Sequence, residues 1–413
     1  MTNAKIIIIG DEILIGQVKD TNSGFLANFL DKLGIKVEKV STIGDNKNDI
    51  LTEIDNGIKN YSITILSGGL GPTKDDITKK TIAEYFNSKL IENKEVLEHV
   101  KQIQKLKNIT PNALNLSQAK VPECCQIIKN ENGTAPGMWI EQNKNILISL
   151  PGVPFELEYI SKNELEEKIK NYFKLKYNIH QNIQTQGIAE SELATKLSEW
   201  ENKLPQNIKL AYLPSAKSVT LRLSMYQEDK EKAEIEINQQ IEKIKKIIPN
   251  NIYTTTNLKK EEILLNLLRE KNKTFCTAES CTGGNISATL TRIPGCSDVF
   301  KGGAVVYCNE AKHNILGVKN ETLEKYTAVS EETVKEMAEG ALKLYNCDYA
   351  ASVSGCAGPG GGTKEIPVGT ICFGLARKGK STITKKCFYY LDRQTNIDYS
   401  TNEVINMMLN ELT

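Results

Sequence analysis

The stretch TFCTAESCTGGNISATL, residues 274–290, decides the fold of the C-terminal part of this chain. It places a short β-forming run, then Ser280, then Gly283 and Gly284, and then a helix-forming segment. A serine at such a strand-to-helix turn is expected to be exposed, and free backbone N–H groups at the helix start can stabilise an oxyanion or hold a phosphate. Taken alone, the stretch also fits a serine or threonine that simply caps a helix.

The element GGAVVYCNEAKHNILGV, residues 302–318, leads from a predicted strand into a predicted helix and offers Tyr307, Asn309 and Lys312 at the junction. A serine nucleophile needs a proton acceptor, and with only three histidines in the chain a Ser–His triad is not expected. Lysine can be the base when burial or a nearby positive charge lowers its pKa, and Tyr307 could pass the proton or fix the lysine. His313 is the rival base, but adjacent helical residues point about 100° apart, so we favour Lys312.

The glycine-rich element VSGCAGPGGGTKEIPVGT, residues 353–370, follows another predicted strand. Glycines around Pro359 remove side chains where the backbone must approach another group closely, and Ser354 and Thr363 add hydroxyl donors. By itself this element fits a flexible loop, but beside the other two it indicates a lid or cradle for a substrate. The residues of this half expected to contact the substrate are Thr282, Gly283, Gly284, Asn309, Ser354, Gly355, Gly358 and Gly360.

The motifs AESCTGG, SGCAGPGGGT and the set Tyr307, Asn309 and Lys312 resemble the C-terminal domain of the CinA family, the nicotinamide-mononucleotide amidohydrolase fold. The resemblance implies hydrolysis of nicotinamide mononucleotide to nicotinate mononucleotide and ammonia in pyridine-nucleotide salvage. The family's serine, tyrosine and lysine fall on Ser280, Tyr307 and Lys312. Ser280 would attack the amide carbon, Lys312 would take and return the proton, and N–H groups near residues 281–284 would hold the oxyanion. This chemistry needs no metal.

The resemblance also suggests how the substrate phosphate is held. Ser354 matches a threonine or serine of the family, and Arg393 in LDRQTN matches an arginine suited to the phosphate. The chain departs from the family where a second arginine often follows, because Asp398 or its neighbours stand there, and this weakens the expected phosphate affinity. Cys356 replaces a usual aliphatic residue, which indicates a packing change or, as an alternative, a second nucleophile.

The first 170 residues are expected to form one α/β domain. The runs 6–9, 63–66 and 146–150 are unbroken and apolar, which is typical of parallel strands buried on both faces. The stretch SGGLGPTKDDITKKTIAEYF, residues 67–86, contains a glycine turn before a predicted helix, and such a turn suits a phosphate. Its adjacent carboxylates suit a divalent cation, or they merely cap the helix. The candidate substrate contacts of this half are Gly68, Gly69, Gly71 and Thr73.

This stretch, together with GDEILIGQVKDTNSGFLANFL (residues 10–30) and SLPGVPFELEYI (residues 149–160), resembles the molybdopterin-binding fold of the MogA and MoeA type and, more closely, the CinA N-terminal domain. The latter resemblance implies metal-dependent ADP-ribose pyrophosphatase activity. Pterin-related chemistry and a binding or structural role remain alternatives, because a fold does not fix a reaction. The metal or substrate candidates implied are Asp11, Glu12, Asn22, Asp76 and Glu190.

A different pattern covers residues 171–255. Apolar residues alternate with polar ones from Val219 to Met225, as in a half-exposed antiparallel strand, and a charged helix is predicted over residues 228–247. Relatives of this family carry a small KH-like module there. A KH domain that grips RNA needs a GxxG loop, which this segment lacks, so we expect a spacer and dimerisation element that does not bind nucleic acid.

The whole-chain properties limit the function classes. A net charge of +1 gives no long-range attraction to nucleic acid or an anionic membrane, and ten cysteines without a CxxC pair indicate a reducing, cytoplasmic setting. We therefore expect two α/β three-layer domains, residues 1–170 and 256–413, joined by a small α+β module, in a homodimer that binds small nucleotides. A competence- or DNA-damage-related protein that acts by partner binding and an amidase for another small amide are the rival hypotheses.

Overall fold

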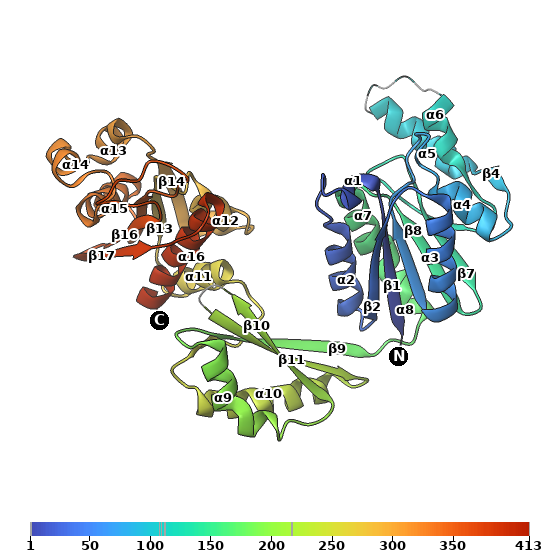
Figure 1. Ribbon diagram of the computed structural model, residues 1–413, viewed down its shortest axis with the longest axis horizontal. Helices are drawn as coiled ribbons and strands as arrows, with labels where there is room; N and C mark the ends of the chain where they lie inside the picture. The colour runs from blue at the N-terminus through green and yellow to red at the C-terminus, as the bar shows by residue number, and fades with distance from the viewer. Residues whose placement is uncertain (1, 107, 109, 111–112, 216–217, 413) are drawn as a thin grey trace. The chain divides into compact units, whose positions relative to one another are not determined.

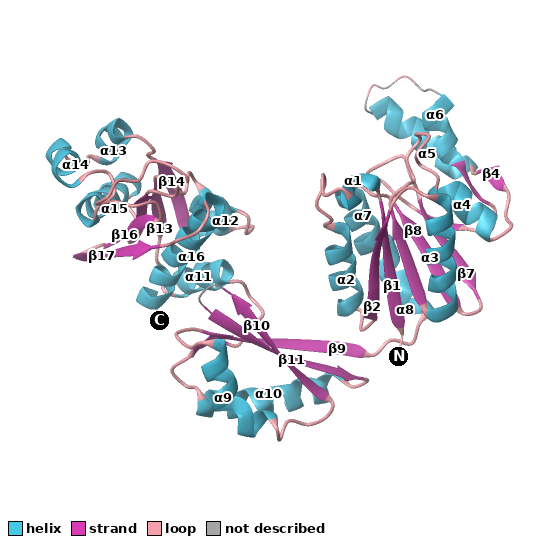
Figure 2. Ribbon diagram, viewed as in Figure 1, coloured by secondary structure: helices cyan, strands magenta, loops and turns pink. Residues whose placement is uncertain are grey.

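The computed structural model describes residues 2–106, 108, 110, 113–215 and 218–412 of the chain. It divides into two compact units, Met1–Thr256 and Asn257–Thr413, and each is described by itself. Figure 1 labels the helices and strands of both units, and Figure 2 distinguishes helices, strands and loops by colour. Among the described residues, no helix combines the length and the apolar character needed to cross a membrane.

The N-terminal domain is built on a six-stranded sheet with the order β2-β1-β3-β8-β7-β6. β1, β2, β3 and β8 are parallel, and β7 and β6 continue the sheet antiparallel. The predicted runs 6–9, 63–66 and 146–150 lie in β1, β3 and β8, three neighbours whose apolar residues are buried, so this prediction is confirmed. The strand bounds are β1 Asn3–Ile9, β2 Lys36–Ile43, β3 Ile63–Ser67, β6 Gln126–Ile128, β7 Gly137–Gln142 and β8 Asn145–Leu150.

Helices cover both faces of this sheet (Figure 1). Ile6 and Ile8 pack with α2, α7 and α8, whereas Ile7 and Ile9 pack with α3 and α4 on the opposite face. Because both faces are covered, β1 is apolar without alternation. The remaining bounds are α1 Asp11–Leu14, α2 Asn22–Lys32, α3 Lys47–Asn60, α4 Thr78–Tyr85, β4 Leu90–Glu92, α5 Lys94–Leu106, α6 Ala113–Leu116, η1 Ser117–Ala119, β5 Lys120–Pro122, α7 Pro154–Ile160, η2 Ser161–Leu165 and α8 Glu166–Tyr172.

The middle module is a four-stranded antiparallel sheet, β10-β11-β9-β12, whose one face packs against α9 and α10. Val219, Leu221, Leu223 and Met225 point into that core, and the intervening residues of β11 are half-buried, as the alternation predicts. Asp229 caps the predicted charged helix by accepting from the Lys232 N–H. The bounds are β9 Tyr177–Thr185, α9 Glu190–Glu201, β10 Ile208–Ser215, β11 Ser218–Gln227, α10 Lys230–Ile247 and β12 Ile252–Thr254.

The C-terminal unit contains a five-stranded sheet with the order β14-β13-β15-β16-β17. β13 is parallel to both β14 and β15, β16 is antiparallel to β15, and β17 is antiparallel to β16. Helices α11, α12 and α16 pack on one face and α13, α14 and α15 on the other. The bounds are α11 Lys260–Glu270, β13 Phe275–Glu279, α12 Asn285–Thr291, η3 Cys296–Asp298, β14 Phe300–Val305, α13 Asn309–Leu316, α14 Asn320–Tyr326, α15 Glu331–Tyr345, β15 Tyr349–Gly355, β16 Thr370–Arg377, β17 Lys380–Phe388 and α16 Arg393–Leu412.

This topology brings the three sequence motifs of the C-terminal unit to one edge of the sheet. The carboxyl ends of adjacent parallel strands meet at the same edge, which is where open α/β sheets bind ligands. Ser280 follows β13, Tyr307 follows β14, and the glycine-rich loop follows β15. Segments far apart in the sequence are therefore positioned to form one site.

Candidate functional site

Ser280 lies in the turn between β13 and α12. Its N–H donates to the Val353 carbonyl oxygen at 3.0 Å, which fixes the residue beside β15. The N-cap position of α12 is Gly284, with φ +99° and no side-chain cap, so the helix-capping interpretation of Ser280 is wrong. The expectation of an exposed serine is also wrong, because Ser280 is only 6% exposed and the Lys312 side chain lies against its hydroxyl.

Lys312 reaches the turn from α13 and is 1% exposed. Its Nζ lies 3.1 Å from Ser280 Oγ and donates to the carbonyl oxygens of Val306 at 3.1 Å and Tyr307 at 3.2 Å. Burial lowers the pKa of Lys312, and the nearby thiols of Cys308 and Cys281 oppose this shift. A neutral amine in this position can give its two N–H groups to the carbonyls and keep its lone pair for the Ser280 hydroxyl.

Two sequence neighbours of this pair, His313 beside Lys312 and Cys281 beside Ser280, are less suited to reaction. His313 Nδ1 lies 2.8 Å from the Val318 carbonyl oxygen, and the residue borders a separate hollow together with Asn309. Burial raises the pKa of the Cys281 thiol to about 12, so this neighbour of Ser280 stays protonated near neutral pH. The geometry therefore favours Lys312 over His313 as the base.

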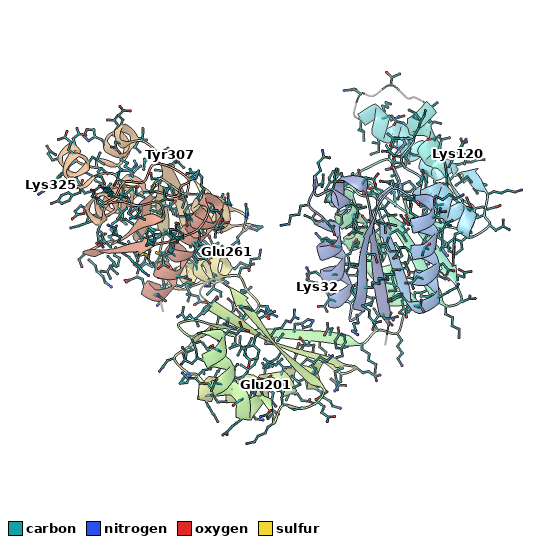
Figure 3. All side chains as sticks on the ribbon, viewed as in Figure 1. Lys32, Lys120, Glu201, Glu261, Tyr307 and Lys325 are labelled. Carbon is teal, nitrogen blue, oxygen red and sulfur yellow. The ribbon has the colours of Figure 1, made fainter. Side chains whose placement is uncertain are left out.

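Tyr307, labelled in Figure 3, is 60% exposed. Its hydroxyl accepts a hydrogen bond from Arg393 Nη2 at 3.0 Å, and Arg393 Nη1 donates to the Gly358 carbonyl oxygen at 2.7 Å. The Tyr307 hydroxyl thus bonds to Arg393, and it is the Tyr307 backbone carbonyl that contacts Lys312. Arg393 ties the glycine-rich loop to the segment that carries the lysine.

Several predicted substrate contacts are already used by the fold. Ser354 is 1% exposed and donates to the Ala328 carbonyl oxygen at 2.6 Å, and Asn309 borders the separate hollow beside His313. The Cys356 thiol donates to the Gly360 carbonyl oxygen at 3.4 Å, a contact that supports packing and not a second nucleophile.

The glycines of the loop are placed differently. A Cβ on Gly355 would lie 2.3 Å from the Ile371 side chain, so this glycine is needed for packing. A Cβ on Gly360 would meet nothing within 4 Å, so the backbone is open there. Gly358 has φ +91° and supplies the carbonyl oxygen that binds Arg393.

Sequence reasoning missed Glu279, which is fully buried at the end of β13. Its carboxylate accepts from the Thr282 hydroxyl at 2.8 Å and from the Gly284 N–H at 3.0 Å, so Thr282 and Gly284 are also engaged. The Gly283 N–H donates to the Ser280 carbonyl oxygen at 3.1 Å. A charged residue at the end of an otherwise uncharged strand, directly before Ser280, is the signal that could have identified it.

A second candidate site is a cavity of about 540 Å³ at the carboxyl edge of the N-terminal sheet. Gly68 and Gly69 line it with φ of +120° and +64°, and a Cβ on Gly68 would lie 2.1 Å from the Ile9 carbonyl oxygen, so only glycine fits there. The lining contains no lysine, arginine or histidine. Its five carboxylates belong to Glu12, Asp45, Asp75, Asp76 and Glu156.

The structure brings only part of the predicted metal set into this cavity. Asp76 lines it but accepts from the N–H groups of Gly71 at 2.7 Å and Thr73 at 2.9 Å, as well as from the Thr73 hydroxyl, and so holds the turn before α4. Asn22 donates to Ser67 Oγ at 3.0 Å and to the Gly152 carbonyl oxygen at 2.7 Å.

Asp11 and Glu190 do not line the cavity. Asp11 and Asp45 form two reciprocal hydrogen bonds: the Asp11 N–H donates to the Asp45 carboxylate at 3.3 Å, and the Asp45 N–H donates to the Asp11 carboxylate at 3.4 Å. Glu190 is the exposed first residue of α9 in the middle module. Within the described ranges no three His, Cys, Asp or Glu side chains are arranged to hold a metal ion. The five predicted metal candidates therefore do not form one ligand set.

Asp45 is a further residue that the sequence reasoning missed. Burial raises the pKa of its carboxyl group; a hydrogen bond from the Asp11 N–H opposes the shift, and the charges of Asp11, Glu12 and Asp75 add to it. Glu12, Asp45 and Asp75 line the same cavity, and Asp11 is hydrogen-bonded to Asp45. Asp45 follows β2, at the same sheet edge as the other motifs, and that position is the signal that could have identified it.

Comparison with known proteins covers the whole chain. Residues 257–412 match the family "CinA C-terminal domain", residues 5–171 "Probable molybdopterin binding domain" and residues 180–254 "Damage-inducible protein CinA KH domain". A "CinA-like protein" of Cytophaga hutchinsonii is 42% identical over 409 residues, 99% of this chain and 98% of that protein. A "Putative competence-damage inducible protein" of Clostridium beijerinckii is 42% identical over 393 residues, 94% of each chain.

Solved structures match one part of the chain. The competence or damage-inducible protein from Enterobacter asburiae is 36% identical, with a TM-score of 0.36, and covers 37% of this chain and 96% of its own. The protein CinA from Thermoplasma acidophilum, described as of unknown function, is 31% identical, with a TM-score of 0.38, and covers 42% of this chain and 98% of its own.

Proposed function

The chain belongs to the CinA family, and on that premise we propose that its C-terminal unit hydrolyses the carboxamide of nicotinamide mononucleotide to nicotinate mononucleotide and ammonia. The observation that carries the proposal is the contact of 3.1 Å between Ser280 Oγ and a buried Lys312 whose other near neighbours are two carbonyl oxygens. No carboxylate among the described residues forms an ion pair with Lys312, so its neutral form is favoured by burial.

In the first half-reaction, neutral Lys312 accepts the proton of the Ser280 hydroxyl while Oγ attacks the carboxamide carbon. The resulting oxyanion needs two N–H donors. Among the described residues, the backbone N–H groups of Cys281 and Thr282 have no backbone carbonyl acceptor, and the Cys281 N–H interacts only with its own sulfur, so both could serve this oxyanion. Lys312 then passes the proton to the departing nitrogen, ammonia leaves, and an ester joins Ser280 to the nicotinate acyl group.

Water completes the reaction. Lys312, again neutral, takes a proton from the water that attacks the ester carbon, and the same N–H pair holds the second oxyanion. When the intermediate collapses, the proton returns to Ser280 Oγ and nicotinate mononucleotide is released. Each proton taken by Lys312 is thus given back within the same half-reaction.

The phosphate of the substrate is assigned to Arg393. Its guanidinium has five N–H donors, and its two hydrogen bonds to Tyr307 and Gly358 leave others for an anion. The Arg393 guanidinium bridges the glycine-rich loop, at Gly358, and the segment before α13, at Tyr307. An amidase for a small amide without phosphate is the rival proposal, and comparison of nicotinamide mononucleotide with free nicotinamide distinguishes the two.

For the N-terminal domain we propose metal-dependent hydrolysis of the diphosphate of ADP-ribose. Support comes from the charge of the cavity, because five carboxylates and no basic residue line it and would repel a diphosphate in the absence of cations. Hard divalent cations prefer oxygen ligands, and the carboxylates that line the cavity would attract one, although no three of the described side chains form a ligand set for it. A bound cation would neutralise the diphosphate and lower the pKa of the attacking water.

The match to a molybdopterin-binding domain supports a second candidate for this cavity, the binding of a phosphorylated pterin. Assays of the full chain with ADP-ribose, with and without a divalent metal, test the hydrolytic proposal. Production of AMP and ribose 5-phosphate only when metal is present is the expected result. Binding of the nucleotide without turnover under all metal conditions would favour the pterin-binding candidate.

A further inference from the structure

Glu279 directly precedes Ser280 and is 0% exposed. Both of its carboxylate oxygens accept backbone N–H groups, which is the arrangement of an ionised carboxylate. No cation among the described residues pairs with it, so its charge is stabilised by hydrogen bonds alone. The Thr277 hydroxyl, within β13, donates to Oε1 at 3.4 Å. Five other donors follow Ser280 in the chain: the Thr282 hydroxyl at 2.8 Å, Gly284 N at 3.0 Å and Ile286 N at 3.0 Å bind Oε2, and Ser287 N at 2.9 Å and the Ser287 hydroxyl at 2.7 Å bind Oε1.

These five bonds all go to the segment that carries the nucleophile. They join the end of β13 to the turn and to the first residues of α12, so the carboxylate spans residues 279–287. Two further bonds close the turn, from Gly283 N to the Ser280 carbonyl oxygen and from Asn285 N to the Thr282 carbonyl oxygen. The turn between β13 and α12 is therefore held by one buried side chain together with these two backbone bonds.

The bonding pattern determines which N–H groups remain for a ligand. Ser280 N is used by the Val353 carbonyl oxygen, and every N–H from residue 283 to 287 has an acceptor among the described residues. In this described segment, the N–H groups without a carbonyl or carboxylate acceptor are those of Cys281, which interacts with its own sulfur, and Thr282. They directly follow the nucleophile, where the oxyanion of an attack by Ser280 Oγ would form.

From this geometry we infer that Glu279 is the positioning residue of the amidase site: it holds the turn so that the Cys281 and Thr282 N–H groups form the oxyanion hole. The inference rests on the proposed function, because it assigns a role within that reaction. Glu279 touches neither substrate nor Lys312 in this role. It acts through the backbone, so its loss should weaken transition-state binding more than substrate binding.

Glu279→Gln tests this role in the full chain. A glutamine keeps the shape but turns an NH2 group toward N–H donors, which breaks the hydrogen bonds on one side of the carboxylate. Loss of a single oxyanion-hole donor lowers kcat by roughly 100- to 1000-fold, and we expect a loss of about 100-fold in kcat with little change in KM. The pH profile should keep its shape, because the lysine is not disturbed.

The matched control is Asp348→Asn. Asp348 is also a carboxylate that accepts a backbone N–H and a hydroxyl, both from Thr274, but it lies at the opposite end of β13 from Ser280. Ser287→Ala is a milder second variant, because it removes only one donor to Glu279 and should lower kcat by roughly fivefold. Thermal unfolding of all variants separates loss of fold from loss of rate.

Two readouts keep the inference separate from the proposed substrate. The first is ammonia release from nicotinamide mononucleotide. The second is the rate at which a fluorophosphonate probe labels Ser280. This labelling reaction uses the same nucleophile and oxyanion hole but does not need that substrate. A labelling rate about 100-fold lower in folded Glu279→Gln, with Asp348→Asn near wild type, is expected. Equal labelling of Glu279→Gln and wild type would overturn the inference, whereas labelling without ammonia release by wild type would overturn only the proposed substrate.

Discussion

The Nζ atom of Lys312 lies 3.1 Å from Ser280 Oγ and faces two backbone carbonyl oxygens, without a carboxylate partner among the described residues. Carbonyl oxygens accept hydrogen bonds but do not neutralise a positive charge, so burial dominates and the pKa of Lys312 is lowered. A buried lysine that is neutral in part of the population can act as a base without help from a histidine.

The pH dependence of the amidase follows from this relationship. Only neutral Lys312 can accept the Ser280 proton, so kcat/KM should rise with pH through the pKa of Lys312 and then level off. Because that pKa is lowered, the midpoint should lie below the ordinary lysine value of about 10.4. A steady-state pH series measures it; activity that falls as pH rises through this range would contradict a lysine base.

Replacement of the base gives a second prediction. Lys312→Arg keeps the positive charge but cannot lose a proton in the working pH range, so ammonia release should fall by roughly 100- to 10,000-fold. The control is Lys343→Arg, a lysine in the last turn of α15. Full activity of Lys312→Arg would show that the proton goes elsewhere.

Arg393→Gln tests the phosphate assignment. A charge-assisted hydrogen bond contributes about 1.5–3 kcal/mol, so the KM for nicotinamide mononucleotide should rise by roughly 10- to 150-fold. Nicotinamide riboside, which lacks the phosphate, should be processed equally by variant and wild type. If both substrates lose the same factor, the guanidinium acts on the loop through Gly358 and not on the phosphate.

Tyr307→Phe distinguishes two roles of the tyrosine. Its hydroxyl bonds Arg393 and its backbone carbonyl bonds Lys312, so removing the hydroxyl should cost only about fivefold or less in kcat. Single-turnover ammonia release measures this directly. A loss of several orders of magnitude would instead support proton transfer through the phenol.

The N-terminal cavity yields a prediction that is independent of the amidase. Asp45→Asn removes a half-buried carboxylate from the acidic lining of the cavity and should abolish metal-dependent hydrolysis of ADP-ribose while ammonia release is unchanged. Glu38→Gln, an exposed carboxylate on β2, is the control. Hydrolysis of ADP-ribose that persists after complete removal of metal by a chelator would contradict the proposal.

The strands and the proximity of Ser280 to Lys312 could be predicted from the sequence for a physical reason. Strands buried on both faces are continuously apolar, as in residues 63–66, and parallel strands bring the residues that follow them to one edge. Ser280 and Lys312 lie just after β13 and early in α13, so strand order alone brings them close. The edge strand β17 was not predicted, because none of its residues is fully buried and its apolar residues Ile383 and Phe388 are exposed among polar ones.

The hydrogen-bond partners of polar side chains could not be predicted in the same way. Ser354 was expected to face a phosphate but donates to the Ala328 carbonyl oxygen, and Asp76 was expected to bind metal but holds the turn before α4. Whether a hydroxyl or carboxylate serves a ligand or the backbone depends on distances of a few tenths of an ångström between distant segments. Glu279 and Asp45 were missed because only the folded chain surrounds them with donors or with other carboxylates.

The most direct test of the central claim is ammonia release from nicotinamide mononucleotide by the full chain and by its Ser280→Ala variant, with thermal unfolding as a check of the fold. The Ser280–Lys312 chemistry predicts that wild type releases one ammonia for each nicotinate mononucleotide formed and that the folded variant releases none above background. Ammonia release by Ser280→Ala at the wild-type rate, or no release by wild type at any pH, would contradict it.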